Sequence, residues 1–315
     1  MISIIIPLYN KEANIRKTLK SVLAQDYSEF ELIIVNDGST DKSVAVINTS
    51  FNDSRINIIN QENKGASAAR NRGVEASKNN YISFIDADDE WEPDYLSKII
   101  ESIKLFPEAE MFCTAGILRS ESGAVTYRAK KELFNTIKII DFFKNPYFYT
   151  NTSSVVVTKS IFLSSGKFPE NLKSNEDVAC LHRLSLLTQV VYCGKPLSIY
   201  NRGIDGHLSS VVHFSVPVNL VSRINYVHEG WVATKCLNKW YLYFIKNEIR
   251  SEILKYIKAK NQKSVNYIVD NIVDDLSNRF SKFELDIYKK GKLKLLSFFI
   301  IYAKKIIFKT RTSNY

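Results

Sequence analysis

The chain has 315 residues, of which 45% are hydrophobic, so it can bury a large core in one domain or two. Its four cysteines show neither C-x-x-C pairing nor close spacing, which argues against a disulfide framework or a cysteine zinc site and favours reduced thiols in a cytosolic protein. The formal net charge of +10 makes nucleic acid and an anionic membrane the two candidate classes of polyanionic partner.

The first 110 residues alternate strand-like and helix-like stretches. The N-terminus, MISIIIPLYN, is apolar without a basic flank, so it predicts a first strand and neither a signal peptide nor a membrane span. The expected strands are short apolar runs rich in β-branched residues, and the expected helices carry apolar residues on one face or are small and polar. The strands are SIIIPL, ELIIV, INIIN and YISFI, and the helices lie in KEANIRKTLKSVLAQ, GASAARNRGVEASKN and, beginning near Pro93, DYLSKIIESIKLF.

This alternation predicts an α/β fold with an open, mainly parallel sheet flanked by helices. The polar clusters PLYN, VNDGSTD and DADD follow the first, second and fourth strands. Because parallel strands end at the same edge, we expect the three clusters to lie together there. Neither G-x-G-x-x-G nor G-x-x-x-x-G-K-[ST] occurs, which argues against a dinucleotide dehydrogenase or a P-loop protein.

The rest of the chain changes character near residue 212. Strands are expected at MFCTAGIL, SSVVVT and QVVYCG, with a helix from Glu176 to about Thr188. Beyond Ser215 the sequence turns helix-like, with few glycines or prolines. We therefore predict a first domain over residues 1–212 and a helical, basic region over residues 213–315.

The stretch YISFIDADDEWEP, residues 81–93, sets an apolar strand directly before a knot of carboxylates. Like charges repel at such spacing unless a cation or water relieves them. The cluster is therefore either a solvated loop leading into a helix, whose first turn suits acidic residues, or a divalent metal site.

In this order the segments SIIIPLYN, ELIIVNDGSTDKS, NKGASAARNRG, YISFIDADDEWEPDYL and TSSVVVTKSIFLSSGKFPENLKSNEDVACLHRL resemble the family 2 inverting glycosyltransferases. The resemblance spans about residues 2–187 and weakens toward 210. It implies a GT-A (Rossmann-like) fold and transfer of a sugar from a nucleotide-sugar donor. The chain beyond it would be a helical extension.

The resemblance places the nucleotide-sugar at residues of the first three polar segments. It implies contacts from Pro7, Tyr9 and Asp37, with Glu12 as a further candidate, and it brings Lys64 and Arg70 near the nucleotide. The Asp37 carboxylate suits a uracil N–H or ribose hydroxyls. The alternatives are an ordinary turn and helix cap for DGSTD and solvated basic side chains for Lys64 and Arg70.

Asp86-x-Asp88 resembles the family's D-x-D motif, which implies Mn²⁺ or Mg²⁺ as the cofactor. The two side chains share a face of an extended segment, and carboxylate oxygens suit a cation that neutralises a departing diphosphate. We expect Asp88 to be the metal ligand, with Asp86 in support or on the ribose. Asp89 and the following glutamates are assigned to the next helix, with Asp89 as its cap.

The resemblance also assigns the catalytic groups and a late phosphate contact. Asn175-Glu176-Asp177 resembles the family's E-D motif, with Asp177 as base for the acceptor hydroxyl and Glu176 orienting acceptor or base. The alternative is a pair of acidic residues that merely open a helix. Arg202 and His207 resemble a late segment that contacts the diphosphate. The Q-x-x-R-W sequence typical of processive polymerases is absent, which favours transfer of a single residue.

The C-terminal tail holds eight Lys/Arg and one acidic residue from Leu285 to Tyr315. Its apolar stretch, residues 295–303, is too short to span a bilayer, but lysines opposite an aliphatic face suit a cationic amphipathic helix on an anionic membrane. The alternative is a helix packed on the protein's own core. No nucleic-acid recognition motif is present, so we expect no nucleic acid partner.

Together these features predict a metal-dependent inverting transferase that moves one sugar from a UDP-hexose or UDP-N-acetylhexosamine to a glycan acceptor, itself lipid-linked. The expected process is cell-surface polysaccharide synthesis, at the inner face of the cell membrane. One alternative is a nucleotidyltransferase, which needs a glycine-rich loop where the chain has PLYNKEAN. The other is a non-catalytic carbohydrate-binding relative, which does not need Asp86, Asp88, Glu176 and Asp177 together.

Overall fold

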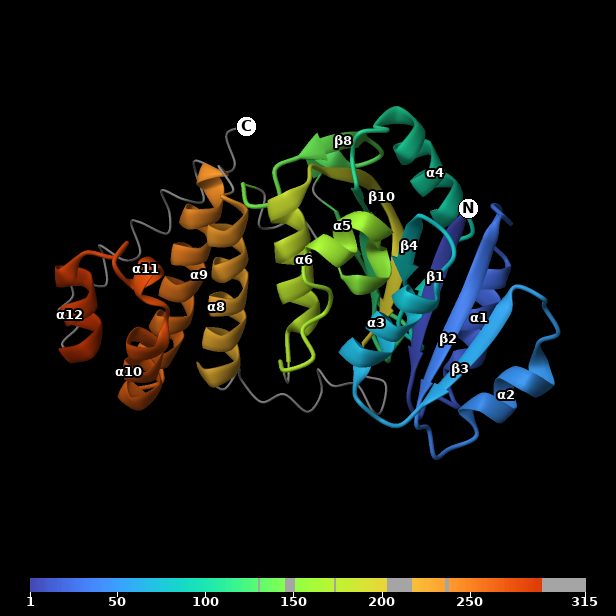
Figure 1. Ribbon diagram of the computed structural model, residues 1–315, viewed down its shortest axis with the longest axis horizontal. Helices are drawn as coiled ribbons and strands as arrows, with labels where there is room; N and C mark the ends of the chain where they lie inside the picture. Colours follow the sequence, from blue (N-terminus) through green and yellow to red (C-terminus); the bar gives the residue numbers. More distant parts are fainter. Residues whose placement is uncertain (130, 145–150, 173, 203–216, 236–237, 291–315) are drawn as a thin grey trace. The chain divides into compact units, whose positions relative to one another are not determined.

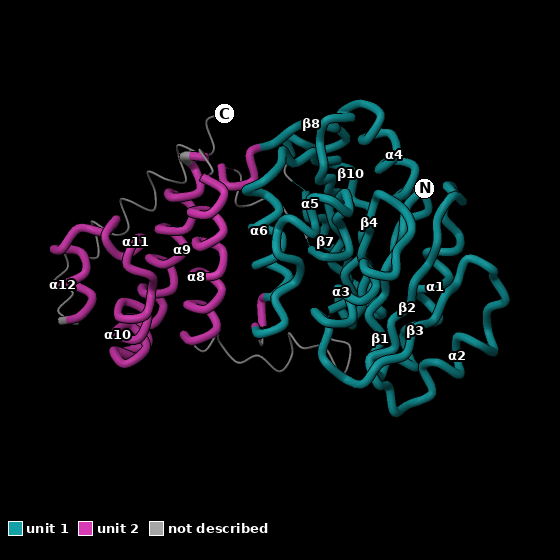
Figure 2. The backbone as a smooth tube through the Cα atoms, in the orientation of Figure 1, with its two compact units in different colours: residues 1–140, 147–171, 176–212 teal, residues 141–146, 172–175, 213–315 magenta. Residues whose placement is uncertain are grey.

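The computed structural model describes residues 1–129, 131–144, 151–172, 174–202, 217–235 and 238–290. The chain divides into two compact units, coloured separately in Figure 2. Unit 1 comprises residues 1–140, 147–171 and 176–212, and unit 2 comprises residues 141–146, 172–175 and 213–315. Two short segments from the first 212 residues therefore group with the helical unit.

The N-terminal part of unit 1 repeats the strand–helix pattern that the sequence predicts (Figure 1). The strands are short and rich in isoleucine and valine, as expected where helices cover both faces of a parallel sheet. The elements are β1 (Ile2–Leu8), α1 (Ile15–Leu23), β2 (Phe30–Asp37), α2 (Ser43–Ser50), β3 (Ile56–Gln61), α3 (Ala66–Ala76) and β4 (Tyr81–Phe84).

The later part of unit 1 adds strands to the same sheet, some of them antiparallel. The strand order is β3-β2-β1-β4-β9-β6-β10-β5, with β7 on β6 and β8 on β10. The first four strands are parallel, β9 is antiparallel to both of its neighbours, and β6 and β10 are parallel. The added elements are β5 (Glu90–Trp91), α4 (Tyr95–Leu105), β6 (Met111–Arg119), β7 (Val125–Arg128), β8 (Ile137–Ile140), β9 (Val155–Thr158), α5 (Lys159–Ser164), α6 (Glu176–Leu187) and β10 (Val190–Asn201).

These elements confirm the predicted α/β class with a mainly parallel sheet, to which the later part of unit 1 adds antiparallel strands. Helix α4 begins two residues after Pro93 and takes Asp94 as its N-cap. The Pro93 carbonyl instead accepts a hydrogen bond from Asp26 N at 3.0 Å, so it stays outside the helix.

The two faces of the sheet carry different helices because side chains alternate along each strand. On β1, Ile4 and Ile6 join the core cluster that includes α1 and α4. Ile5 points the other way, toward α3, where a Cβ on Gly73 would lie 2.4 Å from its Cγ2. Helix α3 therefore packs against the strand at a distance that only glycine allows, as its small, polar sequence predicts.

Unit 2 is helical in its described residues, as the sequence predicts. Its helices are α8 (Pro217–Thr234), α9 (Lys239–Lys258), α10 (Gln262–Asn271), α11 (Asp274–Ser277) and α12 (Lys282–Lys290). Buried ion pairs join them: Arg223 Nη2 lies 2.6 Å from Glu248, and Arg250 Nε lies 2.7 Å from Glu284, which also accepts from Tyr288. Among the described residues, none of the helices combines the length and apolar character needed to cross a membrane.

Candidate active site

The carboxyl ends of β1, β2 and β4 meet at one edge of the sheet, as predicted. Leu8 pairs with Asn36 on β2, and Ile5 pairs with Phe84 on β4. The loop after β1 is tied to the loop after β2, since Asn10 Oδ1 accepts from Thr40 N at 2.8 Å. The structure thus brings PLYN, VNDGSTD and DADD together.

Glu12 and Asp37 are both engaged within this edge. Glu12 Oε2 accepts from Lys42 N at 2.8 Å, one residue before α2. Asp37 is buried, and its carboxylate accepts from Lys64 N at 2.9 Å and Gly65 N at 2.8 Å. Both carboxylates therefore order loops, Glu12 before α2 and Asp37 before α3. Gly65 has φ +91°, a conformation that side-chain-bearing residues rarely adopt, so the turn into α3 needs glycine.

Arg70 on α3 joins the two acidic motifs. Its Nη2 lies 2.7 Å from Asp86 Oδ1, and its Nη1 lies 3.4 Å from Glu176 Oε1. The guanidinium sits 5.1 Å from the ring centroid of Phe168, and only 5% of the residue is exposed. Burial alone would lower the pKa of Arg70, but Asp86 and Glu176 raise it overall, so the side chain is a permanent cation. The alternative of a solvated arginine is therefore wrong.

The acidic loop (residues 86–89) holds three carboxylates in different surroundings. Asp86 pairs with Arg70 and remains about a third exposed. Asp88 is buried, and its Oδ2 lies 2.6 Å from Lys11 Nζ. Asp89 is fully buried, and burial, followed by repulsion from Asp86 and Asp88, raises its pKa.

The assignment of Asp89 and the glutamates to the next helix is wrong. Asp89 Oδ2 accepts from Ser153 Oγ at 2.5 Å, and that hydroxyl also accepts from Asp86 N at 3.1 Å. Glu90 belongs to β5 and accepts from Arg119 at 2.6 Å. The sequence could not show this because the cause is a tertiary contact. Strand β5 pairs with β10 before α4 begins, so these acidic residues lie at the edge of the sheet and not in the helix.

Glu176 and Asp177 form the first turn of α6, as predicted. Burial and then repulsion from Asp177 raise the pKa of Glu176, although Arg70 opposes the shift. Burial also raises the pKa of Asp177, again against Arg70. Carboxyl groups with raised pKa values beside a fixed cation are typical of sites that exchange protons.

The remaining predicted residues are more dispersed. Tyr9 is 46% exposed at the end of β1, next to the partly buried Pro7. Lys64 is exposed, and Arg202 is exposed with its backbone N–H bonded to Arg119 O at 2.8 Å. His207 lies outside the described residues.

Three contacts at the acidic loop were not anticipated from the sequence. Lys11, in the quoted PLYNKEAN, reaches Asp88, and Ser153 bridges Asp86 and Asp89. Asn201 Nδ2 donates to Asp88 O at 2.7 Å from the end of β10. Only Lys11 was recognisable, as a cation inside a polar cluster, because Ser153 and Asn201 come from segments remote in sequence.

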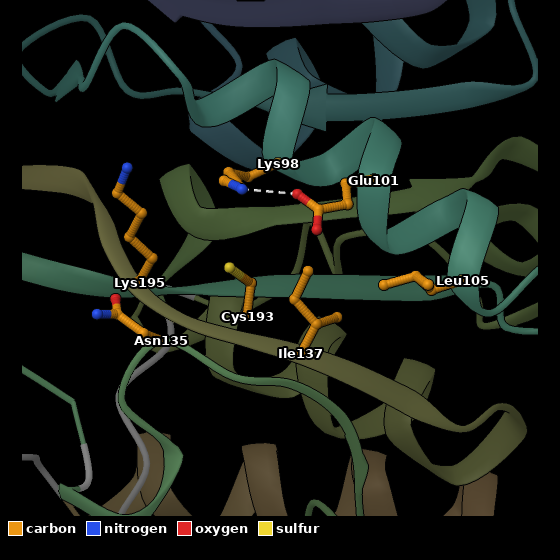
Figure 3. A pocket seen from close by; sticks show the side chains of 7 residues that line it. All are labelled: Lys98, Glu101, Leu105, Asn135, Ile137, Cys193 and Lys195. Carbon is orange, nitrogen blue, oxygen red and sulfur yellow. Dashed lines mark hydrogen bonds and ion pairs between the residues drawn. The ribbon is translucent and has the colours of Figure 1, made fainter.

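A separate cavity of about 480 Å³ lies between α4, β10 and the segment before β8 (Figure 3). Its wall includes the Lys98–Glu101 ion pair and Cys193, a member of the α1/α4 core cluster. None of the acidic-loop or α6 carboxylates lines it.

Known proteins share both the sequence motifs and the architecture. The family described as "Glycosyl transferase family 2" matches residues 3–166. The chain belongs to glycosyl transferase family 2. The match bears out the resemblance of the motifs and makes the nucleotidyltransferase alternative unnecessary.

Two relatives of this family 2 glycosyltransferase illustrate its neighbourhood. It is 31% identical over 206 residues to the putative colanic acid biosynthesis glycosyl transferase WcaA of Escherichia coli, covering 63% of this chain and 69% of that protein. It is 39% identical over 103 residues to the putative teichuronic acid biosynthesis glycosyltransferase TuaG of Bacillus subtilis, covering 32% and 41%.

Other similarities are shorter or structural. The match to glycosyltransferase GlyA of Streptococcus pneumoniae, 45% identical over 103 residues, covers 32% of this chain and only 15% of that protein. The Staphylococcus aureus TarS 1–349 structure in complex with UDP-GlcNAc superposes with a TM-score of 0.68 at 16% identity, covering 98% of this chain and 91% of that one. The TarS likeness confirms the GT-A-like fold with C-terminal helices.

Proposed function

We propose that this family 2 glycosyltransferase moves one sugar from a UDP-hexose or UDP-N-acetylhexosamine to a hydroxyl of a glycan acceptor, with inversion at the anomeric carbon. The acceptor is lipid-linked and the process is cell-surface polysaccharide synthesis. The names of WcaA and TuaG support the process, and the TarS complex with UDP-GlcNAc supports the donor class.

The observation that carries the proposal is the Arg70 bridge. One guanidinium contacts Asp86 in the acidic loop and Glu176 beside Asp177. A transferase needs its leaving-group site and its base on either side of one anomeric carbon. Because Arg70 links the two motifs directly, a donor diphosphate at one and an acceptor hydroxyl at the other can share a reaction centre.

In the proposed mechanism Asp177 is the base. Its carboxylate takes the proton of the acceptor hydroxyl as that oxygen forms a bond to the anomeric carbon. The bond from that carbon to the diphosphate oxygen breaks, and the electron pair leaves with the nucleoside diphosphate. Arg70 holds Glu176 and Asp86 in place, and its buried Nε has no hydrogen-bond partner among the described residues.

The residues of the acidic loop fit a divalent cation, which we propose to be Mn²⁺ or Mg²⁺. No group of three or more His, Cys, Asp or Glu in the described part of the chain forms a complete cage. Mg²⁺ in nucleotide enzymes is commonly held by one or two carboxylates together with substrate phosphates. Asp88, with Asp86 in support, would supply those carboxylates, and Asp89 Oδ1 is a buried oxygen with no partner in the described structure. When bound, the cation stabilises the negative charge that builds on the departing diphosphate.

The nucleotide contacts remain proposals built on this edge. Tyr9 offers an exposed ring on which the nucleobase can stack. Asp37 orders the loop before α3, and its carboxylate can accept a further hydrogen bond. Pro7, Glu12 and Lys64 border the same edge. Arg202 and His207 remain candidate contacts to the diphosphate.

Replacing Asp177 with Asn tests the assignment of the base. We expect kcat to fall by about 100-fold or more, because the amide cannot accept the hydroxyl proton. Binding of UDP, measured by titration calorimetry, should be unchanged. Near-normal transfer by the variant would refute the assignment of Asp177.

A separate assay of wild type with a panel of UDP-, GDP- and dTDP-sugars, with and without Mn²⁺, identifies the donor.

A further inference from the structure

The acidic loop is neutralised by the chain's own cations. Asp86 pairs with Arg70, and Asp88 pairs with Lys11, in each case with oxygen and nitrogen within 2.7 Å. The sequence shows only a cluster of like charges, whose repulsion a bound metal could relieve. In the folded protein Asp86 and Asp88, the two proposed ligands of that metal, already have partners.

Lys11 is held where it can reach across the sheet edge. Its backbone N–H donates to Ser43 Oγ at 2.7 Å, which ties the loop after β1 to the start of α2. The neighbouring Glu12 N donates to Asp41 Oδ2 at 3.0 Å. With its backbone anchored, the side chain extends toward the end of β4, and only 14% of it is exposed.

The Lys11–Asp88 pair is sheltered from water on both sides, since the Asp88 side chain is 6% exposed. A charge pair in such a place is screened far less than one on the surface. It also occupies an oxygen that a metal would need, because Mg²⁺ binds its oxygen ligands directly, at about 2.0–2.1 Å. An ammonium at 2.6 Å and a metal ion on the same oxygen would repel each other.

We propose that Lys11 is an exchangeable counter-ion of Asp88: its ammonium neutralises the carboxylate in the free protein and moves to the diphosphate oxygens when a nucleotide arrives with a divalent cation. This inference rests on the metal site of the proposed function. Phosphate oxygens suit a lysine ammonium on a flexible stem. Lys11 thereby keeps metal affinity low without nucleotide and, by returning to Asp88, favours release of the nucleoside diphosphate.

The test is direct binding of Mn²⁺, followed by electron paramagnetic resonance of the free ion, in wild type, Lys11→Met and Lys42→Met. Without UDP we expect Lys11→Met to bind Mn²⁺ about 10-fold more tightly than wild type, since one competing charge is gone. Lys42 is an exposed lysine of the same edge whose side chain has no carboxylate partner in the described structure, so Lys42→Met should bind like wild type. With saturating UDP the advantage of Lys11→Met should shrink or reverse.

Thermal unfolding supplies a second readout. Lys11→Met leaves Asp88 buried without its cation, so its Tm should fall and should rise more with Mn²⁺ than that of wild type. Lys11→Arg keeps a cation and should behave like wild type. If Lys11→Met does not fold, Lys11→Gln serves the same measurements, because its amide can still donate to Asp88.

The outcomes separate this inference from the proposed function. Equal Mn²⁺ affinity in wild type and Lys11→Met without UDP overturns the role of Lys11 and leaves the metal site standing. An equal rise of Mn²⁺ affinity in Lys42→Met also overturns it, since the loss of any positive charge at this edge would then explain the effect. Absence of Mn²⁺ binding in every variant, even with UDP bound, refutes the metal site and the inference with it.

Discussion

At the scale of residues, the site is organised by cations as much as by the carboxylates that mark it in the sequence. Arg70 contacts Asp86 and Glu176, and Lys11 contacts Asp88. Arg70 and Lys11 are both largely buried, so removal of either leaves a carboxylate without its compensating charge in surroundings of low dielectric. The positions of the acidic side chains therefore depend on two basic ones.

Arg70→Met should lower the free energy of unfolding by about 3 kcal/mol, because Asp86 and Glu176 lose their shared partner. Transfer activity should fall as well, since Asp177 lies beside the displaced Glu176. Urea unfolding followed by circular dichroism measures the first effect, and a UDP-release assay measures the second.

Arg72 on the same helix is the matched control. Its side chain is 58% exposed, and its Nη1 lies 3.9 Å from Glu75 Oε2. An ion pair so exposed contributes little to stability. Arg72→Met should change the free energy of unfolding by less than about 0.5 kcal/mol. A similar loss of unfolding free energy in both variants would mean that the ion pairs of Arg70 do not stabilise the protein more than an exposed pair does.

At the scale of elements, α3 positions Arg70 because the helix lies unusually close to β1. Gly73 faces Ile5, and a Cβ at that position would lie 2.4 Å from Ile5 Cγ2. The close approach also brings Asn71 to Phe168, whose carbonyl accepts from its amide at 2.9 Å. Packing of α3 is thus linked to the surroundings of Glu176 and Asp177, the proposed catalytic carboxylates.

Gly73→Ala should destabilise the protein by about 1–2 kcal/mol. Alanine favours a helix by about 1 kcal/mol over glycine, but overpacking against a fully buried isoleucine costs about 1–3 kcal/mol or more. Chemical denaturation measures the difference.

Combining Gly73→Ala with Ile5→Ala provides the control, since the second change removes the clashing methyl group. In that background Gly73→Ala should be neutral or stabilising. An equal cost in both backgrounds would show that the contact with Ile5 is not the cause.

At the scale of the whole molecule, the last described helix of the helical unit, α12, includes the first residues of the basic tail. Tyr288 is fully buried, and its hydroxyl donates to Glu284, which also binds Arg250. Helix α12 therefore extends to Lys290, and Glu284 and Tyr288 are its buried contacts with the rest of unit 2. Of the predicted membrane-binding tail, residues 285–315, the part from residue 291 onward lies outside the described residues.

A truncation after Lys290 consequently tests membrane binding without removing α12. On vesicles containing phosphatidylglycerol, the full chain should float with the lipid and the truncated chain should remain in solution, because the truncation removes six basic residues and the aliphatic face of the tail.

Vesicles of phosphatidylcholine alone are the control and should bind neither form strongly, since they lack net negative charge. Equal flotation of the full and truncated chains on the anionic vesicles would refute a role for the tail.

The sequence by itself determined the α/β class, the succession along the chain of the first four strands and of helices α1, α3 and α4, and the edge at which the polar clusters meet. It could do so because apolar periodicity and short β-branched runs are local properties, and parallel strands must end at a common edge. It also marked Asp86, Asp88, Glu176 and Asp177, since their motifs are contiguous.

Only the tertiary structure decided which partner each charge has. Asp89 bonds to Ser153 across 64 positions of sequence, Arg70 reaches Glu176 across 106, and Lys11 lies on Asp88. Such pairings depend on strand order and register, which no local pattern encodes. For the same reason a run of repelling carboxylates could not reveal that the fold supplies two of its own counter-ions.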